Sequence, residues 1–214
     1  MSKRVVAIGV FDGVHRGHQE ILNRAKEIAD GGSVIALTFD PHPATVFAPE
    51  RAPKSLVTLA DRVVLLKIHN ADQVAVIKFD EKFASMSPEA FVDSVLINQL
   101  QATDIVVGEN FTYGHKAQGN IDSLRASGES KKFDVHVLSL SEEDTTPEHI
   151  AESLVSNVGM GAILGGGFSL VLHGAVLGAK KTTSSLSSRI SKSLSSEEDE
   201  VLSPSLSDYF AHKK

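Results

Sequence analysis

Short apolar runs rich in β-branched residues alternate with segments of helical spacing over the first 140 residues, and this alternation constrains the fold more than any other feature. Strands are predicted at residues 5–9, 34–38, 74–77, 105–108 and 135–138. Because these runs are nearly all apolar, both faces of each strand are expected to be buried, as in a parallel sheet covered by helices. The β-α-β-α order favours the same architecture. The sequence therefore predicts an α/β fold with a parallel sheet and helices on both faces.

Helices are expected between these strands. Apolar residues at helical spacing mark residues 21–29, where Asp30 and two glycines end the helix, and residues 59–66. Ser87 followed by Pro88 is typical of a helix start. In parallel sheets, ligands bind beyond the carboxyl ends of the strands. Functional residues are therefore expected to follow the first, second and fourth strands.

Composition excludes several classes of protein. The 214 residues are 42% hydrophobic and 22% charged, which is typical of a soluble globular chain. A net charge of −6 without a Lys/Arg-rich run argues against nucleic acid as a partner. The absence of cysteine excludes thiolate sites and is consistent with a cytoplasmic location. Residues 158–179 lack charge, but seven glycines and a histidine argue against a membrane span. The oligomeric state is left open.

Residues 9–18, Gly-Val-Phe-Asp-Gly-Val-His-Arg-Gly-His, follow the first strand and open the first helix. Helix N-termini bind phosphates through unpaired N–H groups. Gly13 and Gly17 permit tight turns and close approach of a ligand. His15 and His18 are three residues apart, so both are expected on one face, where they can donate to a phosphate oxygen as charge develops. The alternatives are two ordinary surface histidines or a metal site, for which no further ligands cluster.

A second candidate segment, residues 38–43, reads Thr-Phe-Asp-Pro-His-Pro and follows the second strand. Two prolines stiffen this loop and fix the direction of His42. The alternative is a rigid turn that carries an exposed histidine.

A third segment, residues 108–120, follows the fourth strand. Asn110 can both donate and accept hydrogen bonds, and Phe111 and Tyr113 can pack on a flat ring. The alternative is a glycine-rich surface loop with one core aromatic residue. Because all three segments follow predicted strands, we expect them to meet at one edge of the sheet.

With these three segments in place, the sequence resembles the bacterial bifunctional riboflavin kinase/FAD synthetase family over about residues 4–140. The His-x-Gly-His motif at residues 15–18 is similar to that of the nucleotidylyltransferase superfamily, and residues 38–43 and 107–119 match further family signatures in order and spacing. The resemblance implies a Rossmann-like nucleotidylyltransferase fold. It also implies an FMN adenylyltransferase that uses ATP, FMN and Mg²⁺ and releases FAD and pyrophosphate.

The resemblance also implies roles for individual residues. Catalytic roles are expected for His15, His18 and Asn110. Contacts to ATP are expected from Gly9, Phe11, Asp12, Gly17, His18, Thr146 and Arg189. Contacts to the flavin are expected from His42, Pro43, Asn110, Phe111 and Tyr113. No protein residue is expected to ligate a metal.

The match weakens after about residue 140. We expect an adenylyltransferase domain at residues 1–163, a degraded start of a riboflavin kinase domain at 164–180, and a Ser- and acid-rich, disordered tail at 181–214. Riboflavin kinase activity is not expected, because the Pro-Thr-Ala-Asn signature of that domain is absent.

The family's Ser-Ser-Thr-x-Ile-Arg motif is also altered. In the alignment favoured by the flanking residues, Ala151 takes the place of the arginine; in the alternative, Ser187-Ser188-Arg189-Ile190 is the motif. Loss of the arginine motivates a second hypothesis, a non-catalytic relic that binds ATP or flavin. A third is a nucleotidyltransferase with another phosphorylated acceptor, such as a sugar alcohol phosphate or phosphopantetheine.

Overall fold

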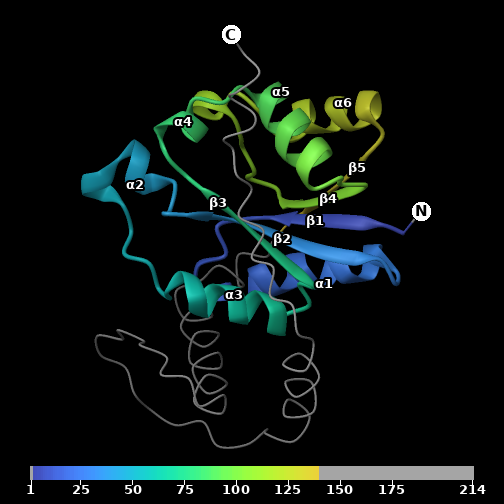
Figure 1. Cartoon of the computed structure of the whole chain (residues 1–214), viewed down its shortest axis with the longest axis horizontal. Coiled ribbons are helices and arrows are strands. Elements are labelled where there is room, and N and C mark those ends of the chain that lie inside the picture. The colour runs from blue at the N-terminus through green and yellow to red at the C-terminus, as the bar shows by residue number, and fades with distance from the viewer. Residues whose placement is uncertain (1, 140–214) are drawn as a thin grey trace, which may run out of the picture.

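The computed structural model describes residues 2–139, which contain a five-stranded sheet and its covering helices (Figure 1). The strands are β1 (Arg4–Ile8), β2 (Ser33–Asp40), β3 (Gln73–Lys78), β4 (Asp104–Gly108) and β5 (Asp134–Leu138). The α-helices are α1 (Arg16–Ala29), α2 (Ala44–Phe47), α3 (Leu59–Ile68), α4 (Glu81–Ala84), α5 (Pro88–Phe91) and α6 (Ile121–Lys131). Three short 3₁₀ turns are η1 (Asp12–Val14), η2 (Pro49–Arg51) and η4 (His115–Ala117), and η3 (Val92–Gln99) is a π-helix. All five predicted strands are confirmed.

The sheet is parallel throughout, with the strand order β3-β2-β1-β4-β5. In the register, Val6 lies beside Ile35 of β2 and Ile105 of β4. The chain first builds outward from β1 to β3 and then returns to place β4 on the other side of β1. This reversal of strand order is the point at which Rossmann-like sheets open a crevice for ligands.

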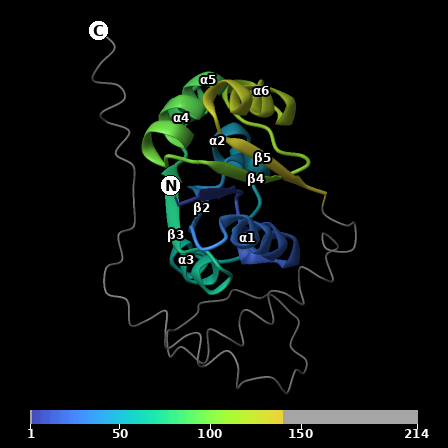
Figure 2. The same ribbon diagram turned by 90° about the vertical axis from the view of Figure 1, so that its right-hand side faces the viewer.

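Alternate residues of β1 belong to different cores. Val5 and Ala7 pack with α1 and α3, whereas Val6 and Ile8 pack with the segment from α4 to α6. The two ribbon views agree that α1 and α3 cover one face and that α4, α5 and α6 cover the other (Figures 1 and 2). The predicted parallel sheet with helices on both faces is therefore confirmed.

Local sequence explains where the helices begin and end. Ser87 caps α5 as expected, because its hydroxyl accepts a hydrogen bond from the N–H of Ala90 at 3.2 Å. The helix then continues past Phe91 as the π-helix η3. Helix α1 ends at Asp30, which adopts a left-handed conformation with φ of 42°.

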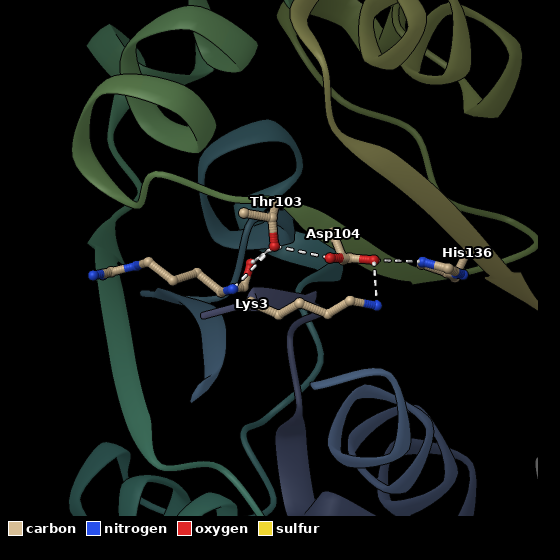
Figure 3. A network of polar contacts seen from close by, with 5 residues as sticks. Lys3, Thr103, Asp104 and His136 are labelled. Atoms are coloured by element: carbon tan, nitrogen blue, oxygen red, sulfur yellow. Dashed lines mark hydrogen bonds and ion pairs between the residues drawn. The ribbon is translucent and has the colours of Figure 1, made fainter. Parts of the chain in front are cut away.

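A network of polar contacts links neighbouring strands at their amino ends (Figure 3). The buried carboxylate of Asp104 accepts a hydrogen bond from the Thr103 hydroxyl at 2.8 Å and lies 3.0 Å from Nε2 of His136. Nζ of Lys3 lies 3.8 Å from the same carboxylate, and the N–H of Arg4 donates to the Thr103 hydroxyl. The network joins β1, β4 and β5 at the edge opposite to the carboxyl ends of the strands.

The described part of the chain contains no helix long and apolar enough to cross a membrane. The apolar segment at residues 158–179 lies outside the described residues, as do the expected domain boundaries at 163 and 180 and the expected tail.

Candidate active site

Helix α1 begins at the carboxyl end of β1 without a side-chain cap. Its N-cap residue, His15, is extended (φ −66°, ψ 174°), makes no side-chain cap hydrogen bond, and is followed by no acidic residue in the first turn. By contrast, Thr58 caps α3 and Asn120 caps α6. The start of α1 therefore keeps its positive partial charge, which favours an anion.

His15 and His18 lie together at this helix start, as predicted. Their rings stack with centroids 3.7 Å apart and planes inclined by 29°. Phe11 packs edge-on against His18, with centroids 5.2 Å apart. Burial lowers the pKa of His18 well below its ordinary value of 6.5, and the charges of His15 and Arg62 lower this pKa further. His18 is therefore neutral near pH 7, and its buried Nδ1 has no hydrogen-bond partner within residues 2–139.

The loop between β1 and α1 is fixed by its own residues. Gly13 has φ of 73°, so it makes the tight turn that the sequence predicted. Phe11 is fully buried, and the carboxylate of Asp12 accepts hydrogen bonds from the N–H groups of Leu56 (2.9 Å) and Val57 (3.3 Å). The side chains of Phe11 and Asp12 are thus committed to holding the loop, and contacts to ATP at these positions would come from the backbone.

A cavity of about 340 Å³ opens at the carboxyl edge of the sheet. Segments that follow β1, β2, β3 and β4 all contribute to its wall. The lining residues are Gly9, Val10, Phe39, Pro43, Phe47, Phe79, Phe83, Ala84, Met86, Phe91, Asn110, Phe111, Thr112, Tyr113, Gly114 and Ala117. The wall is mostly aromatic and aliphatic, with few polar groups, which is typical of a pocket for a flat organic ring.

The cavity brings together most of the residues predicted to contact a flavin. Pro43, Asn110, Phe111 and Tyr113 line it, and so does Gly9 from the predicted ATP set. His42 is not part of the lining. Its Nδ1 accepts a hydrogen bond from the N–H of Ala44 at 3.1 Å, so its imidazole holds the start of α2.

Tyr113 is held in place from two sides. Its ring stacks with Phe111, with centroids 5.6 Å apart and planes inclined by 13°. Its backbone pairs with Gly119 in both directions, at 3.0 and 2.9 Å. A Cβ at position 119 would lie 2.7 Å from the Tyr113 ring, so only glycine allows the two segments to approach this closely.

Sequence reasoning missed the part of the wall that comes from α2 and from the segment after β3. These residues are Phe47, Phe79, Phe83, Met86 and Phe91. Aromatic residues recur along this stretch, but the same pattern is typical of ordinary core packing. The buried Arg62 also received no role from the sequence.

The two halves of the site adjoin at the end of β1. Gly9 and Val10 line the cavity, and Phe11, the next residue, contacts His18. The arrangement can therefore hold a flat ring and a phosphate chain side by side. Thr146, Ala151 and Arg189 lie outside the described residues, so their predicted roles stay predictions.

The fold and the site define an α/β protein of the Rossmann-like class, with an uncapped helix start beside an aromatic cavity. A model of the FAD synthetase family matches residues 1–152. The chain belongs to this family.

Curated relatives agree with the family assignment. The chain is 37% identical over 146 residues to a bifunctional riboflavin kinase/FMN adenylyltransferase of Bacillus subtilis, covering 67% of this chain and 46% of that protein. A Buchnera aphidicola protein of the same name is 32% identical over 190 residues, which cover 84% of this chain and 61% of that protein. An Escherichia coli protein of the same name is 32% identical over 133 residues, which cover 61% of this chain and 42% of that protein. The chain spans about half the length of these relatives.

A crystal structure described as a macrolide-efflux protein from Streptococcus pneumoniae superposes with a TM-score of 0.58. It is 24% identical and covers 71% of this chain and 51% of that chain. At this identity the likeness shows the fold alone.

Proposed function

We propose that this chain is an FMN adenylyltransferase, which transfers AMP from ATP to the phosphate of FMN and releases FAD and pyrophosphate. The observation that carries the proposal is the aromatic cavity beside the uncapped start of α1, where His15 and His18 stack. Membership of the FAD synthetase family supports the same reaction. In this proposal the cavity holds the isoalloxazine ring of FMN, and the helix start holds the phosphates of ATP.

The proposed reaction is one in-line displacement. A phosphate oxygen of FMN attacks the α-phosphorus of ATP, the bond from that phosphorus to the bridging oxygen of the β-phosphate breaks, and pyrophosphate leaves. No covalent enzyme intermediate is needed, so positioning and charge stabilisation account for the catalysis. His15, His18 and the start of α1 stabilise the phosphate oxygens, and Asn110 orients the substrates from the cavity wall.

Mg²⁺ is proposed as a partner of the ATP phosphates. Residues 2–139 contain no group of three or more side chains that could hold a metal ion. This is compatible with Mg²⁺, which proteins commonly bind through substrate phosphates and few side chains. When bound, the ion neutralises phosphate charge and makes pyrophosphate a better leaving group.

The flavin contacts are proposed from the cavity lining. Phe111 and Tyr113 offer flat apolar surface, Pro43 closes the opposite loop, and Asn110 supplies an amide for a polar atom of the ring. His42 would act indirectly, by holding α2 and its exposed Phe47 at the cavity. A volume of about 340 Å³ is within the range of small-molecule pockets.

Further parts of the proposal concern the rest of the chain. We propose an adenylyltransferase domain that extends to about residue 163, a cytoplasmic location, and no phosphorylation of riboflavin by these 214 residues, which lack the Pro-Thr-Ala-Asn signature. Ala151, at the position of the family's arginine, favours one alternative function, a relic that binds ATP and flavin without turnover.

Incubation of the purified chain with ATP, MgCl₂ and FMN, followed by chromatography of the flavins, tests the proposal. When FMN is the substrate, FAD should accumulate. When riboflavin is supplied in place of FMN, no FMN should form. Phosphopantetheine and glycerol phosphate serve as competing acceptors. Nucleotide transfer to one of these in place of FMN would overturn the flavin assignment, and ATP binding without any FAD would favour the relic.

A further inference from the structure

Arg62 is a charged residue inside the core. It lies on α3, is 1% exposed, and is the largest of the fully buried side chains in the described part of the chain. A guanidinium is always protonated, so Arg62 carries a full positive charge in this position. Burial of a charge is costly unless hydrogen bonds satisfy it and an opposite charge balances it.

The guanidinium is only partly satisfied by the protein. Its Nη1 donates to the carbonyl of Phe39 at 2.9 Å and lies 3.5 Å from the Thr38 hydroxyl. Its Nε is buried without a hydrogen-bond partner, and no carboxylate within residues 2–139 forms an ion pair with it. The positive charge of Arg62 is therefore not balanced by an anion of the described chain.

The contacts of Arg62 lead directly to the candidate site. The Thr38 hydroxyl donates to the carbonyl of Val10 at 2.7 Å, so Arg62 connects α3 to the ends of β1 and β2. Its charge also reaches His18, whose pKa it helps to lower. A buried cation behind a phosphate-binding helix start strengthens the local positive potential, because little water screens it there.

We propose that Arg62 is a positioning residue for the nucleotide, and that the phosphates of ATP supply the anion that balances its buried charge. This inference rests on the proposed function for the identity of the ligand, but its test needs only a phosphate chain. In the bound state, Arg62 acts through the loop at Val10 and through His18, without direct contact to the reacting atoms. Its charge favours the β- and γ-phosphates, which become the leaving pyrophosphate.

Substitution of Arg62 separates its charge from its packing. Arg62→Met keeps most of the volume and removes the charge, and Arg62→Lys keeps the charge and loses the planar fork. Arg125→Met is the matched control, because it removes the same charge from an exposed position on α6, across the sheet. Thr38→Val removes the hydroxyl link to Val10 without a change of charge.

The experiment measures two affinities for each folded variant: Mg²⁺-pyrophosphate by calorimetry and FMN by its fluorescence. We expect Arg62→Met to lower the affinity for pyrophosphate at least tenfold. The same substitution should lower the affinity for FMN less than threefold. Arg62→Lys should bind pyrophosphate within about threefold of the parent, and Arg125→Met within about twofold. Thr38→Val, which breaks the link between Arg62 and Val10, should weaken pyrophosphate binding more than Arg125→Met and less than Arg62→Met. If Arg62→Met does not fold, Arg62→Gln replaces it, with the same expectation.

Two results would overturn the inference. Parental affinity for pyrophosphate in the uncharged variant would show that the charge is not used. Equal losses of FMN and pyrophosphate affinity, or an equal loss in Arg62→Lys, would assign Arg62 a structural role only. The test is separate from that of the function: if the parent makes no FAD but pyrophosphate binding still depends on Arg62, the inference stands while the adenylyltransferase proposal fails.

Discussion

The imidazole rings of His15 and His18 stack face to face at the start of α1, with their centroids 3.7 Å apart. At this distance, protonation of one ring opposes protonation of the other. Burial and the nearby charges lower the pKa of His18, so its imidazole is neutral near pH 7. A neutral ring can donate one hydrogen bond to a phosphate oxygen, and that bond strengthens as negative charge develops in the transition state.

Replacement of His18 by Gln should therefore affect the reaction more than the fold. We expect the rate of FAD formation to fall about 100-fold or more, because one transition-state donor is lost or misplaced. The thermal midpoint of unfolding should change little. His136→Gln is the control, since this histidine lies at the opposite edge of the sheet and should leave the rate unchanged. A rate of the His18 variant equal to that of the parent would remove His18 from the site.

The lowered pKa of His18 also predicts how stability depends on pH. A histidine whose pKa is lower in the folded than in the unfolded state contributes stability that is present above the unfolded value of about 6.5 and is lost as the pH falls toward the folded value. Between pH 7 and pH 5, the unfolding free energy of the parent should therefore fall more steeply than that of His18→Gln. Urea titrations at a series of pH values give both slopes. If the unfolding free energies of the parent and of His18→Gln fall equally with pH, the pKa of His18 is not lowered in the folded state.

Gly119 and Gly108 offer a matched pair of alanine substitutions in one loop region. A Cβ at position 119 would lie 2.7 Å from the ring of Tyr113, whereas a Cβ at position 108 would meet nothing within 4 Å. Overpacking of this kind costs about 1–3 kcal/mol, here by displacing Tyr113 from the cavity wall. Gly119→Ala should weaken FMN binding about tenfold, and Gly108→Ala should change it less than twofold. Similar affinities in both variants would argue against Tyr113 as part of the flavin pocket.

Asp104 provides the complementary case, a residue important for the fold and remote from the site. Its carboxylate accepts from Thr103 and contacts Lys3 and His136 at the amino ends of the strands (Figure 3). Asp104→Asn should lower the unfolding free energy by about 1–3 kcal/mol, because the polar partners of this buried side chain lose their charged acceptor. The kcat/KM for FMN, measured where the variant is folded, should match that of the parent. A large change in kcat/KM with unchanged stability would mean that this polar network contributes to catalysis.

Ala151 tests whether the chain is a slow enzyme or a relic. In the family alignment favoured by its flanks, this position holds an arginine that neutralises phosphate charge. We expect Ala151→Arg to raise kcat/KM for FAD formation at least tenfold, which corresponds to about 1.4 kcal/mol on the barrier. Arg189→Ala is the companion variant. If Ala151→Arg has no effect while Arg189→Ala abolishes activity, residues 187–190 are the true motif.

The fold was largely predictable because its signals are local and repeated. Runs such as Val5–Val6–Ala7–Ile8 can be buried on both faces only in a covered sheet, and all five such runs are strands. The strand order and the helix α6 were not predicted. Strand order depends on which faces pack together over long separations, and residues 121–131 carry only a weak apolar period.

The site was predictable where a motif dictates chemistry, and less so where packing builds the wall. His15, His18 and Asn110 follow strands and carry polar groups, so their position alone pointed to the carboxyl edge. Phe79 and Phe83 look like core residues in the sequence, and only the return of the chain after β3 brings them to the cavity. Arg62, proposed above as a positioning residue, received no role from the sequence, because helical spacing does not reveal that a guanidinium lacks a balancing carboxylate.

The most direct test of the central claim follows the phosphate groups of ATP. The chain is incubated with FMN, Mg²⁺ and ATP labelled at either the α- or the γ-phosphate, and the flavins and phosphates are separated. The proposed reaction predicts that the α-label enters FAD and the γ-label leaves in pyrophosphate, in both cases in proportion to FMN consumed. Consumption of FMN without α-label in FAD, or bound ATP that stays intact in the presence of FMN, would contradict it.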